Sequence, residues 1–313
     1  MAGTFAHMIL VRTLCRPETL DGISALTAPM KRALMMQTSY AELGAVSPDL
    51  PYLKLRDDSA AGWGNVMHYW QTADLVRLAV PALGTLGDDD MGGAQRLAWL
   101  FGYVAHLVTD LTVHPAIVPY KGHETEHRVC ELNQDVYIFD KMGFGDVNRV
   151  EYLNNGGIRD CDLAAIAPMW TKALKANTTR QPVTMGPEVQ APTGTPEPEK
   201  WHEHYVWAVD KFAEEGGRFP WITRHLLRKK SVLYPSLKKA RQSEYVRGLR
   251  TPAGAIIAYE DLFAMAQRNT LDTWSELAAA ISQNTPAAFA LKNANLDTGL
   301  ADTGGSIFWR SVA

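Results

Sequence analysis

The chain has 313 residues, of which 46% are hydrophobic and 21% are charged. This composition is typical of a globular protein that buries a core, and the length fits one large domain or two ordinary ones. The formal net charge of -3 gives no indication of the basic surface that duplex nucleic acid requires. Three cysteines without a CxxC pair do not indicate a disulfide framework or a cysteine-type zinc site.

The first part of the chain has a helical pattern over residues 1–45, interrupted at Gly22 and Pro29. Its beginning, MAGTFAHMILVRTLCRP, has no basic n-region, and its short apolar run is broken by His7 and Arg12. We therefore expect no secretory signal and synthesis in the cytoplasm. We also expect no transmembrane helix, because no apolar run reaches the ~20 residues that a span requires.

The rest of the chain is predicted to consist of helices joined by loops. Residues 47–53, SPDLPYL, are expected to form a loop because two prolines flank Asp49. Residues 179–200 are rich in Pro, Gly and Thr and are expected to form a loop or lid. No alternating strand pattern or hairpin turn stands out. The predicted helices cover residues 64–83, 92–114, 123–142, 160–177, 201–214, 221–248 and 253–283.

The predicted helix at 92–114 is apolar but carries His106, Asp110 and His114 at spacing i, i+4, i+8. Because each step of four residues advances only about 40° around a helix, all three side chains lie on one side. Burying two imidazoles and a carboxylate is costly unless a partner satisfies them. Either a hydrogen-bonded core network or a divalent metal ion can do so.

Five further candidate ligands lie before and after this helix. His127 and Glu131 are four residues apart in HRVCE and share a helix face. His68 lies on an apolar helix in GNVMHYW, Asp49 lies on the proline-flanked loop, and His7 lies near the start. A set of nitrogen and oxygen donors without cysteine is typical of a catalytic rather than a structural zinc site.

The order of these residues resembles the zinc-dependent phospholipase C family, which shares its fold with the P1/S1-type nucleases. The resemblance is carried by the pattern H…PD…H…HxxxDxxxHP…HxxxE, matched by His7, Asp49, His68, His106, Asp110, His114, His127 and Glu131. It implies an all-α fold, a single compact multi-helix domain of the phospholipase C/P1 nuclease type with a Pro-rich loop insertion. Residues 1–178 are then the metal-binding helical core, 179–200 the loop or lid, and 201–313 a C-terminal helical layer on the same domain.

The resemblance also implies two or three Zn²⁺ ions in a cleft. One ion would be held by Asp49, His68, His106 and Asp110, a second by His114, His127 and Glu131, and a third by His7 and Asp110. In secreted members the processed N-terminal residue also binds the third ion. Because no signal is expected here, we expect that third site to be weaker, empty, or completed by another residue or water.

The activity that the resemblance implies is hydrolysis of the glycerol-side phosphodiester bond of glycerophospholipids to diacylglycerol and a phosphorylated head group. Clustered zinc neutralises the phosphate and lowers the pKa of a bound water toward ~7. Asp49 is the candidate catalytic residue, as both a ligand and the base that takes the water's proton. Asp135, one turn beyond Glu131, is a candidate to orient a ligand imidazole.

Two other functions stay open at this point. One is a P1/S1-like single-strand nuclease, which requires stacking aromatic residues and a cationic track that a net charge of -3 does not indicate. The other is a non-catalytic zinc-stabilised helical module, which the many histidine and carboxylate donors without cysteine argue against.

A phospholipase acts on a phospholipid membrane surface, so a phospholipase without a signal peptide meets the membrane of the cell that makes it. One hypothesis is an antibacterial effector toxin, exported by a non-classical route such as type VI secretion and paired with an immunity protein. Another is an intracellular enzyme that a regulatory partner holds inactive until it is triggered.

Overall fold

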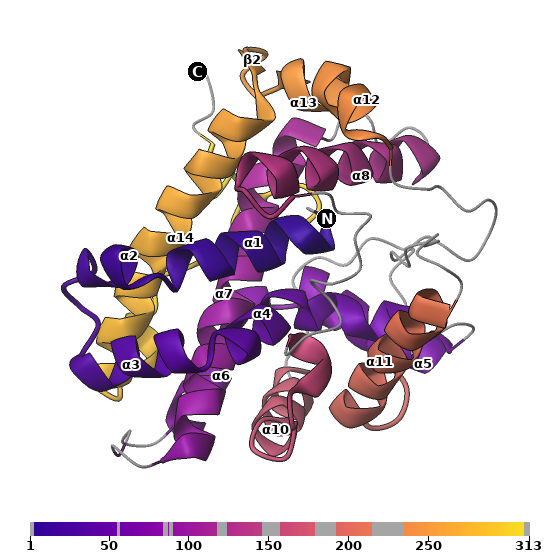
Figure 1. Ribbon diagram of the computed structural model, residues 1–313. Coiled ribbons are helices and arrows are strands. Elements are labelled where there is room, and N and C mark those ends of the chain that lie inside the picture. Colours follow the sequence, from indigo (N-terminus) through magenta and orange to yellow (C-terminus); the bar gives the residue numbers. More distant parts are fainter. Residues whose placement is uncertain are drawn as a thin grey trace.

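Helices make up nearly all of the regular structure in the part of the chain that the computed structural model describes (Figure 1). The described residues are 3–54, 57–83, 87, 90–117, 124–145, 157–178, 192–214 and 235–309. The prediction of an all-α protein is therefore confirmed.

The described elements divide at residue 117 into two sets. Up to residue 117 they are α1 (Thr4–Leu14), α2 (Pro17–Asp21), α3 (Ala28–Met36), α4 (Thr38–Val46), the 3-10 helix η1 (Ser47–Leu53), α5 (Asp58–Tyr69), α6 (Thr72–Ala79), the 3-10 helix η2 (Val80–Ala82) and α7 (Met91–Ile117). After it come α8 (Glu124–Lys141), η4 (Ile158–Asp160), α10 (Ala167–Thr178), α11 (Pro198–Glu214), α12 (Leu237–Gln242), α13 (Glu244–Arg247), α14 (Tyr259–Ser282) and η5 (Pro286–Ala288). Two antiparallel hairpins consist of β1 (Leu249–Arg250) with β2 (Ile256–Ile257), and β3 (Ala294–Asn295) with β4 (Leu300–Ala301).

Several predicted boundaries at prolines and turns are corrected. Pro29 does not interrupt a helix but lies in the first turn of α3, where the missing N–H has no helical partner to lose. Residues 47–53 form a 3-10 helix rather than a loop. The predicted helix over 64–83 is divided because Gln71 has a left-handed backbone with φ of 49°. Pro115 does not end α7, which continues to Ile117.

The predicted elements of the second half are also revised. Residues 198–200 belong to the first turn of α11, and residues 179–191 of the expected lid lie outside the described residues. Of the predicted helix over 221–248, residues 221–234 lie outside the described residues and the rest forms α12 and α13. The next predicted helix starts at Tyr259, after the first hairpin.

Helix α7 runs through the middle of the molecule, with α1 and α8 across it and α14 along one side (Figure 1). Its contacts include α1, α3, α4, α6 and α14. Nearly every residue from Leu97 to Ile117 is buried, which is why this stretch is apolar on all sides. The three polar residues predicted to share one side of it are therefore enclosed by other elements.

Two glycines allow α4 and α7 to pack with their backbones in contact. A Cβ atom at Gly44 would overlap the carbonyl oxygen of Trp99, and a Cβ atom at Gly102 would overlap that of Ala41. Any larger residue at either position requires the helices to move apart. The close approach brings the last turn of α4 next to the middle of α7.

The buried apolar side chains form one cluster that extends from α1 to the segment after α14. Trp274 of α14 is fully buried and its Nε1 donates to the carbonyl oxygen of Phe101, at 2.9 Å, which fixes α14 on α7. Cys15, Cys130 and Cys161 are buried free thiols. Among the described helices, α7 included, none combines the length and apolar character of a bilayer-spanning segment.

Candidate metal centre

The structure brings all eight predicted ligands together in three groups. Within each group, one potential ligand atom per residue lies within 4.8 Å of the others. The groups are His7, His106 and Asp110; Asp49, His68 and His106; and His114, His127 and Glu131. The first two groups adjoin because they share His106, and the third is linked to them through α7.

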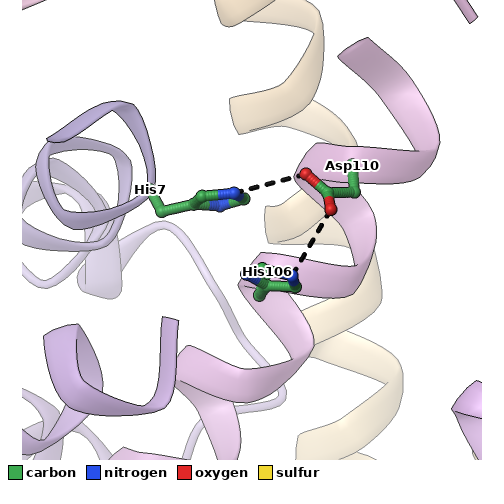
Figure 2. Close-up of side chains that lie close together, drawn as sticks. All are labelled: His7, His106 and Asp110. Atoms are coloured by element: carbon green, nitrogen blue, oxygen red, sulfur yellow. Dashed lines mark ion pairs between the residues drawn. The ribbon is translucent and has the colours of Figure 1, made fainter. Parts of the chain in front are cut away.

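Asp110 lies between the imidazoles of the first and third groups. Its Oδ1 atom is 3.2 Å from Nε2 of His7, and its Oδ2 atom is 3.4 Å from Nε2 of His106 (Figure 2). Oδ1 is also 3.7 Å from Nε2 of His114. Because the two oxygens face different imidazoles, this carboxylate can be shared between neighbouring metal ions.

His7 reaches the centre from α1, across from the α7 residues (Figure 2). Its ring stacks on that of His106, with centroids 4.3 Å apart and an angle of 17° between the planes. The first turn of α1 is held by Asp135 of α8, whose Oδ1 accepts a hydrogen bond from the N–H of Ala6 at 2.9 Å. Gly3 leaves the space for this carboxylate, because a Cβ atom there would overlap it. The contact that Asp135 makes here is with the backbone of α1, whereas the sequence predicted one with a ligand imidazole.

Three of the candidate histidines share one hydrogen-bonding pattern. Their Nδ1 atoms lie 2.7–2.8 Å from backbone carbonyl oxygens, which belong to Gly64 for His68, to Ala45 for His106 and to Leu296 for His114. A carbonyl oxygen only accepts, so each Nδ1 carries the proton and Nε2 of the neutral ring keeps its lone pair. Fixing the ring in this way is how proteins prepare a histidine to bind a metal through Nε2.

The buried polar atoms of the first two groups fit a divalent cation. Within the described part of the chain, the Nε2 atoms of His7, His68 and His106 and the Oδ1 atom of Asp49 make no hydrogen bond. His68 Nε2 and Asp49 Oδ1 are 3.3 Å apart, but they are not aligned as donor and acceptor. A buried polar group without a partner costs about 1–3 kcal/mol. A cation in each of the two groups would give these atoms partners, and nitrogen and oxygen donors without cysteine suit zinc.

The protonation states of the two carboxylates and of His7 are those that metal binding requires. For His106, burial would lower the pKa but Asp110 and Asp49 raise it, so a metal ion at its Nε2 would compete with a proton. Burial alone would raise the pKa of Asp49, but the His106 and His68 imidazoles hold that pKa below its usual value. Burial would likewise raise the pKa of Asp110, but His114 and His106 hold it well below the usual range. Burial, helped by His106, lowers the pKa of His7. At neutral pH the carboxylates are therefore ionised, and His7 is neutral with a lone pair to donate.

The third group joins α7 to α8. His127 Nε2 lies 2.8 Å from Glu131 Oε1, one turn further along α8, as the i, i+4 spacing predicted. The His127 ring lies edge to face with that of His114, with centroids 5.6 Å apart. The HxxxE pair of one helix thus faces the last histidine of the other.

The ligands differ in their access to solvent. The side chains of His7, His68, His106, Asp110 and His114 are 0% exposed, whereas Asp49 keeps 15% and His127 keeps 11% of its side-chain surface. Of the candidate ligands, Asp49 and His127 are thus the two with the most solvent-exposed side chains.

The sequence did not indicate that a segment near the C-terminus reaches the centre. Leu296 accepts the hydrogen bond from His114, and its own N–H donates to the carbonyl oxygen of His68, at 3.0 Å. Asp297 accepts a hydrogen bond from the hydroxyl of Tyr69, at 2.7 Å, and its Oδ1 lies 3.8 Å from Nδ1 of His114. Every residue has a backbone carbonyl, so no sequence motif could indicate that Leu296 contributes one to the centre.

The comparison with protein families agrees with this geometry. Residues 6–180, more than half of the chain, match the zinc dependent phospholipase C family. The chain belongs to this family of zinc-dependent hydrolases, and the resemblance drawn from the order of the ligands is confirmed. The curated proteins and the solved structures that were compared with the chain include no significant match. All eight candidate ligands lie within the matched residues, whereas Leu296 and Asp297 lie beyond them.

Proposed function

We propose that this chain is a zinc-dependent phospholipase C that hydrolyses the glycerol-side phosphodiester bond of glycerophospholipids, producing diacylglycerol and a phosphorylated head group. The observation that carries the proposal is the convergence of eight nitrogen and oxygen donors in three groups, within the region that matches the family. Membership of a phospholipase C family supports this reaction, and the donor set supports zinc as the cofactor.

The proposal assigns ligands to two zinc ions and to a third site. One ion takes Asp49, His68, His106 and Asp110; the second takes His114, His127 and Glu131; the third site takes His7 and Asp110. When bound, the ions neutralise the phosphodiester and activate a water as the nucleophile. Asp110 would contribute to both the first ion and the third site, because its two oxygens face His106 and His7.

Asp49 is the proposed general base. Its side chain keeps 15% of its surface exposed, and its carboxylate is ionised at neutral pH because His106 and His68 hold its pKa low. It can therefore accept the proton of the attacking water. The rings of Tyr52 and Tyr69 lie beside His68, with centroids 5.6 and 6.0 Å from that of its imidazole.

The test compares lipid and nucleic acid as substrates of the purified, zinc-loaded protein. Phosphatidylcholine vesicles and single-stranded DNA are incubated in parallel, with and without a chelator, and the products are identified by mass spectrometry. We expect diacylglycerol and phosphocholine to form only without the chelator. DNA cleavage without lipid cleavage would replace the proposal with a nuclease function, and zinc binding without either activity would leave a zinc-stabilised helical module.

A further inference from the structure

Residues 293–299, here called the C-terminal strap, contain β3 and the turn that leads to β4, and they lie outside the region that matches the family. The strap does not leave the body of the protein but returns to the candidate metal centre, more than 180 residues along the chain from His114. Its backbone is tied to two of the elements that carry candidate ligands, α5 and α7.

One end of the strap is fixed at the junction of α5 and α6. The hydroxyl of Thr72 donates to the carbonyl oxygen of Ala294, at 3.1 Å, and accepts from the N–H of the same residue, at 3.2 Å. Asn293 Oδ1 accepts from the N–H groups of Ala73 and Asp74, at 3.0 and 2.9 Å, at the beginning of α6. These bonds satisfy N–H groups that a helix start leaves without partners.

The other end of the strap lies against the last turns of α7. Gly299 has a φ of 70°, and a Cβ atom there would lie 2.5 Å from Cγ of Pro115 and 3.1 Å from the carbonyl oxygen of Leu111. Between the two anchors, Leu296 is fully buried and its carbonyl oxygen lies 2.7 Å from Nδ1 of His114.

The hydrogen bond from His114 to Leu296 selects one of two tautomers. With the proton on Nδ1, the lone pair of Nε2 is available to the group formed with His127 and Glu131. The alternative places the proton on Nε2, which has Asp110 Oδ1 as a possible acceptor 3.7 Å away. In that tautomer the lone pair is on Nδ1, facing the strap. Carboxylate oxygens lie at similar distances from both nitrogens, Asp110 at 3.7 Å from Nε2 and Asp297 at 3.8 Å from Nδ1. The Leu296 carbonyl, at 2.7 Å from Nδ1, is the acceptor within hydrogen-bond distance and therefore favours the Nδ1–H tautomer.

We propose that the C-terminal strap is a positioning element of the third ligand group: the Leu296 carbonyl, seated by Gly299 and Thr72, holds His114 in the tautomer that presents Nε2. The inference rests on the proposed function in that it takes His114, His127 and Glu131 to be zinc ligands. It adds that residues beyond the family region determine the affinity of that zinc site.

The first test is Gly299→Ala with Gly304→Ala as the matched control. Both glycines have positive φ, at 70° and 86°, so both variants carry the same kind of backbone strain. A Cβ atom at Gly304 meets nothing within 4 Å, whereas one at Gly299 must push the strap away from α7. Zinc affinity is measured by competition with a chromophoric chelator, and the His114 tautomer by ¹⁵N NMR of the zinc-free protein.

We expect Gly299→Ala to weaken one zinc site roughly tenfold to a hundredfold, the range found when a partner of a metal-binding histidine is lost. The NMR spectrum should show His114 moving toward the Nε2–H tautomer. Gly304→Ala should match the wild type in both measurements. Equal zinc affinity and an unchanged tautomer in folded Gly299→Ala would overturn the inference, because a strap that only stabilises the fold would lower the unfolding temperature alone.

A second pair of variants tests the role of the strap in zinc binding if Gly299→Ala does not fold. Thr72→Val removes the hydroxyl that holds Ala294 and keeps the shape of the side chain, and Thr72→Ser restores the hydroxyl. We expect weaker zinc binding in Thr72→Val and wild-type binding in Thr72→Ser; equal affinities in the two would overturn the inference.

Lipid hydrolysis by the wild type is scored separately from zinc binding. If the wild type cleaves lipid while Gly299→Ala and Thr72→Val bind zinc normally, the strap inference fails and the proposed function stands. If the variants lose zinc and the wild type cleaves no lipid, the strap inference stands and the proposed function fails.

Discussion

Replacing Asp110 by Asn tests whether one carboxylate serves two metal sites. The side chain is 0% exposed, and its two oxygens lie 3.2 Å from His7 Nε2 and 3.4 Å from His106 Nε2. Asn has nearly the same shape, so α7 should keep its packing. It has one oxygen in place of two and no charge, so it can serve only one of the two sites.

The size of the effect follows from the charge that is removed. Two unit charges about 4 Å apart interact by about 4 kcal/mol at the effective dielectric constant of ~20 that suits protein sites. Each ~1.4 kcal/mol of transition-state stabilisation is a factor of ten in rate. We therefore expect turnover to fall by roughly two to four orders of magnitude, together with the loss of at least part of the bound zinc.

The assay measures initial rates of phosphatidylcholine hydrolysis and the zinc content of the same preparation by elemental analysis. Asp140→Asn is the matched control, because it makes the same chemical change at a carboxylate that pairs with Arg241 at 2.6 Å and belongs to none of the three groups. The control should keep its rate within about twofold. If purified, folded Asp110→Asn keeps more than about a tenth of wild-type activity, Asp110 is not a shared ligand.

Three further outcomes are expected. Elemental analysis should find at least two zinc ions per chain; one ion or none would contradict the assignment. Chelation should lower the unfolding temperature, because zinc at 100 times its dissociation constant stabilises the folded protein by about 2.7 kcal/mol per site. Asp49→Asn should lower kcat with KM and zinc content nearly unchanged, since an amide can still offer an oxygen but cannot accept a proton; an unchanged kcat would place the base elsewhere, with Glu131 the next candidate. Gly102→Ala should lower the free energy of unfolding in urea by about 1–3 kcal/mol, because α4 and α7 must separate. Gly92→Ala should leave it unchanged, because a Cβ atom there would meet no atom closer than 3.4 Å.

The clustering of the candidate ligands could be predicted from the sequence because helical spacing is a local property. His106, Asp110 and His114 share one side of α7 by the geometry of any α-helix, and the pair His127 and Glu131 repeats the same rule on α8. The prediction needed no tertiary structure for these five residues. The order of the motif then brought in the remaining three, which lie on other elements.

The boundaries that were predicted wrongly depend on context that a single stretch does not contain. Pro29 was read as a break, yet a proline in the first turn is compatible with a helix. Gln71 divides two helices in a left-handed conformation that its residue type does not announce. Export and an immunity or regulatory partner stay predictions, because neither the fold nor the family bears on them.

The atoms that orient the ligands could not be predicted, because they are backbone carbonyls brought in by packing. Ala45 accepts from His106 only because Gly44 and Gly102 let α4 and α7 touch, and Leu296 accepts from His114 only because the strap returns to α7. A motif therefore specifies which side chains can bind a metal, whereas the packing of the whole chain specifies which nitrogen each imidazole presents. On this argument, substitutions at positions such as Gly102, which touch no ligand directly, alter zinc affinity by changing the partner of an Nδ1 atom.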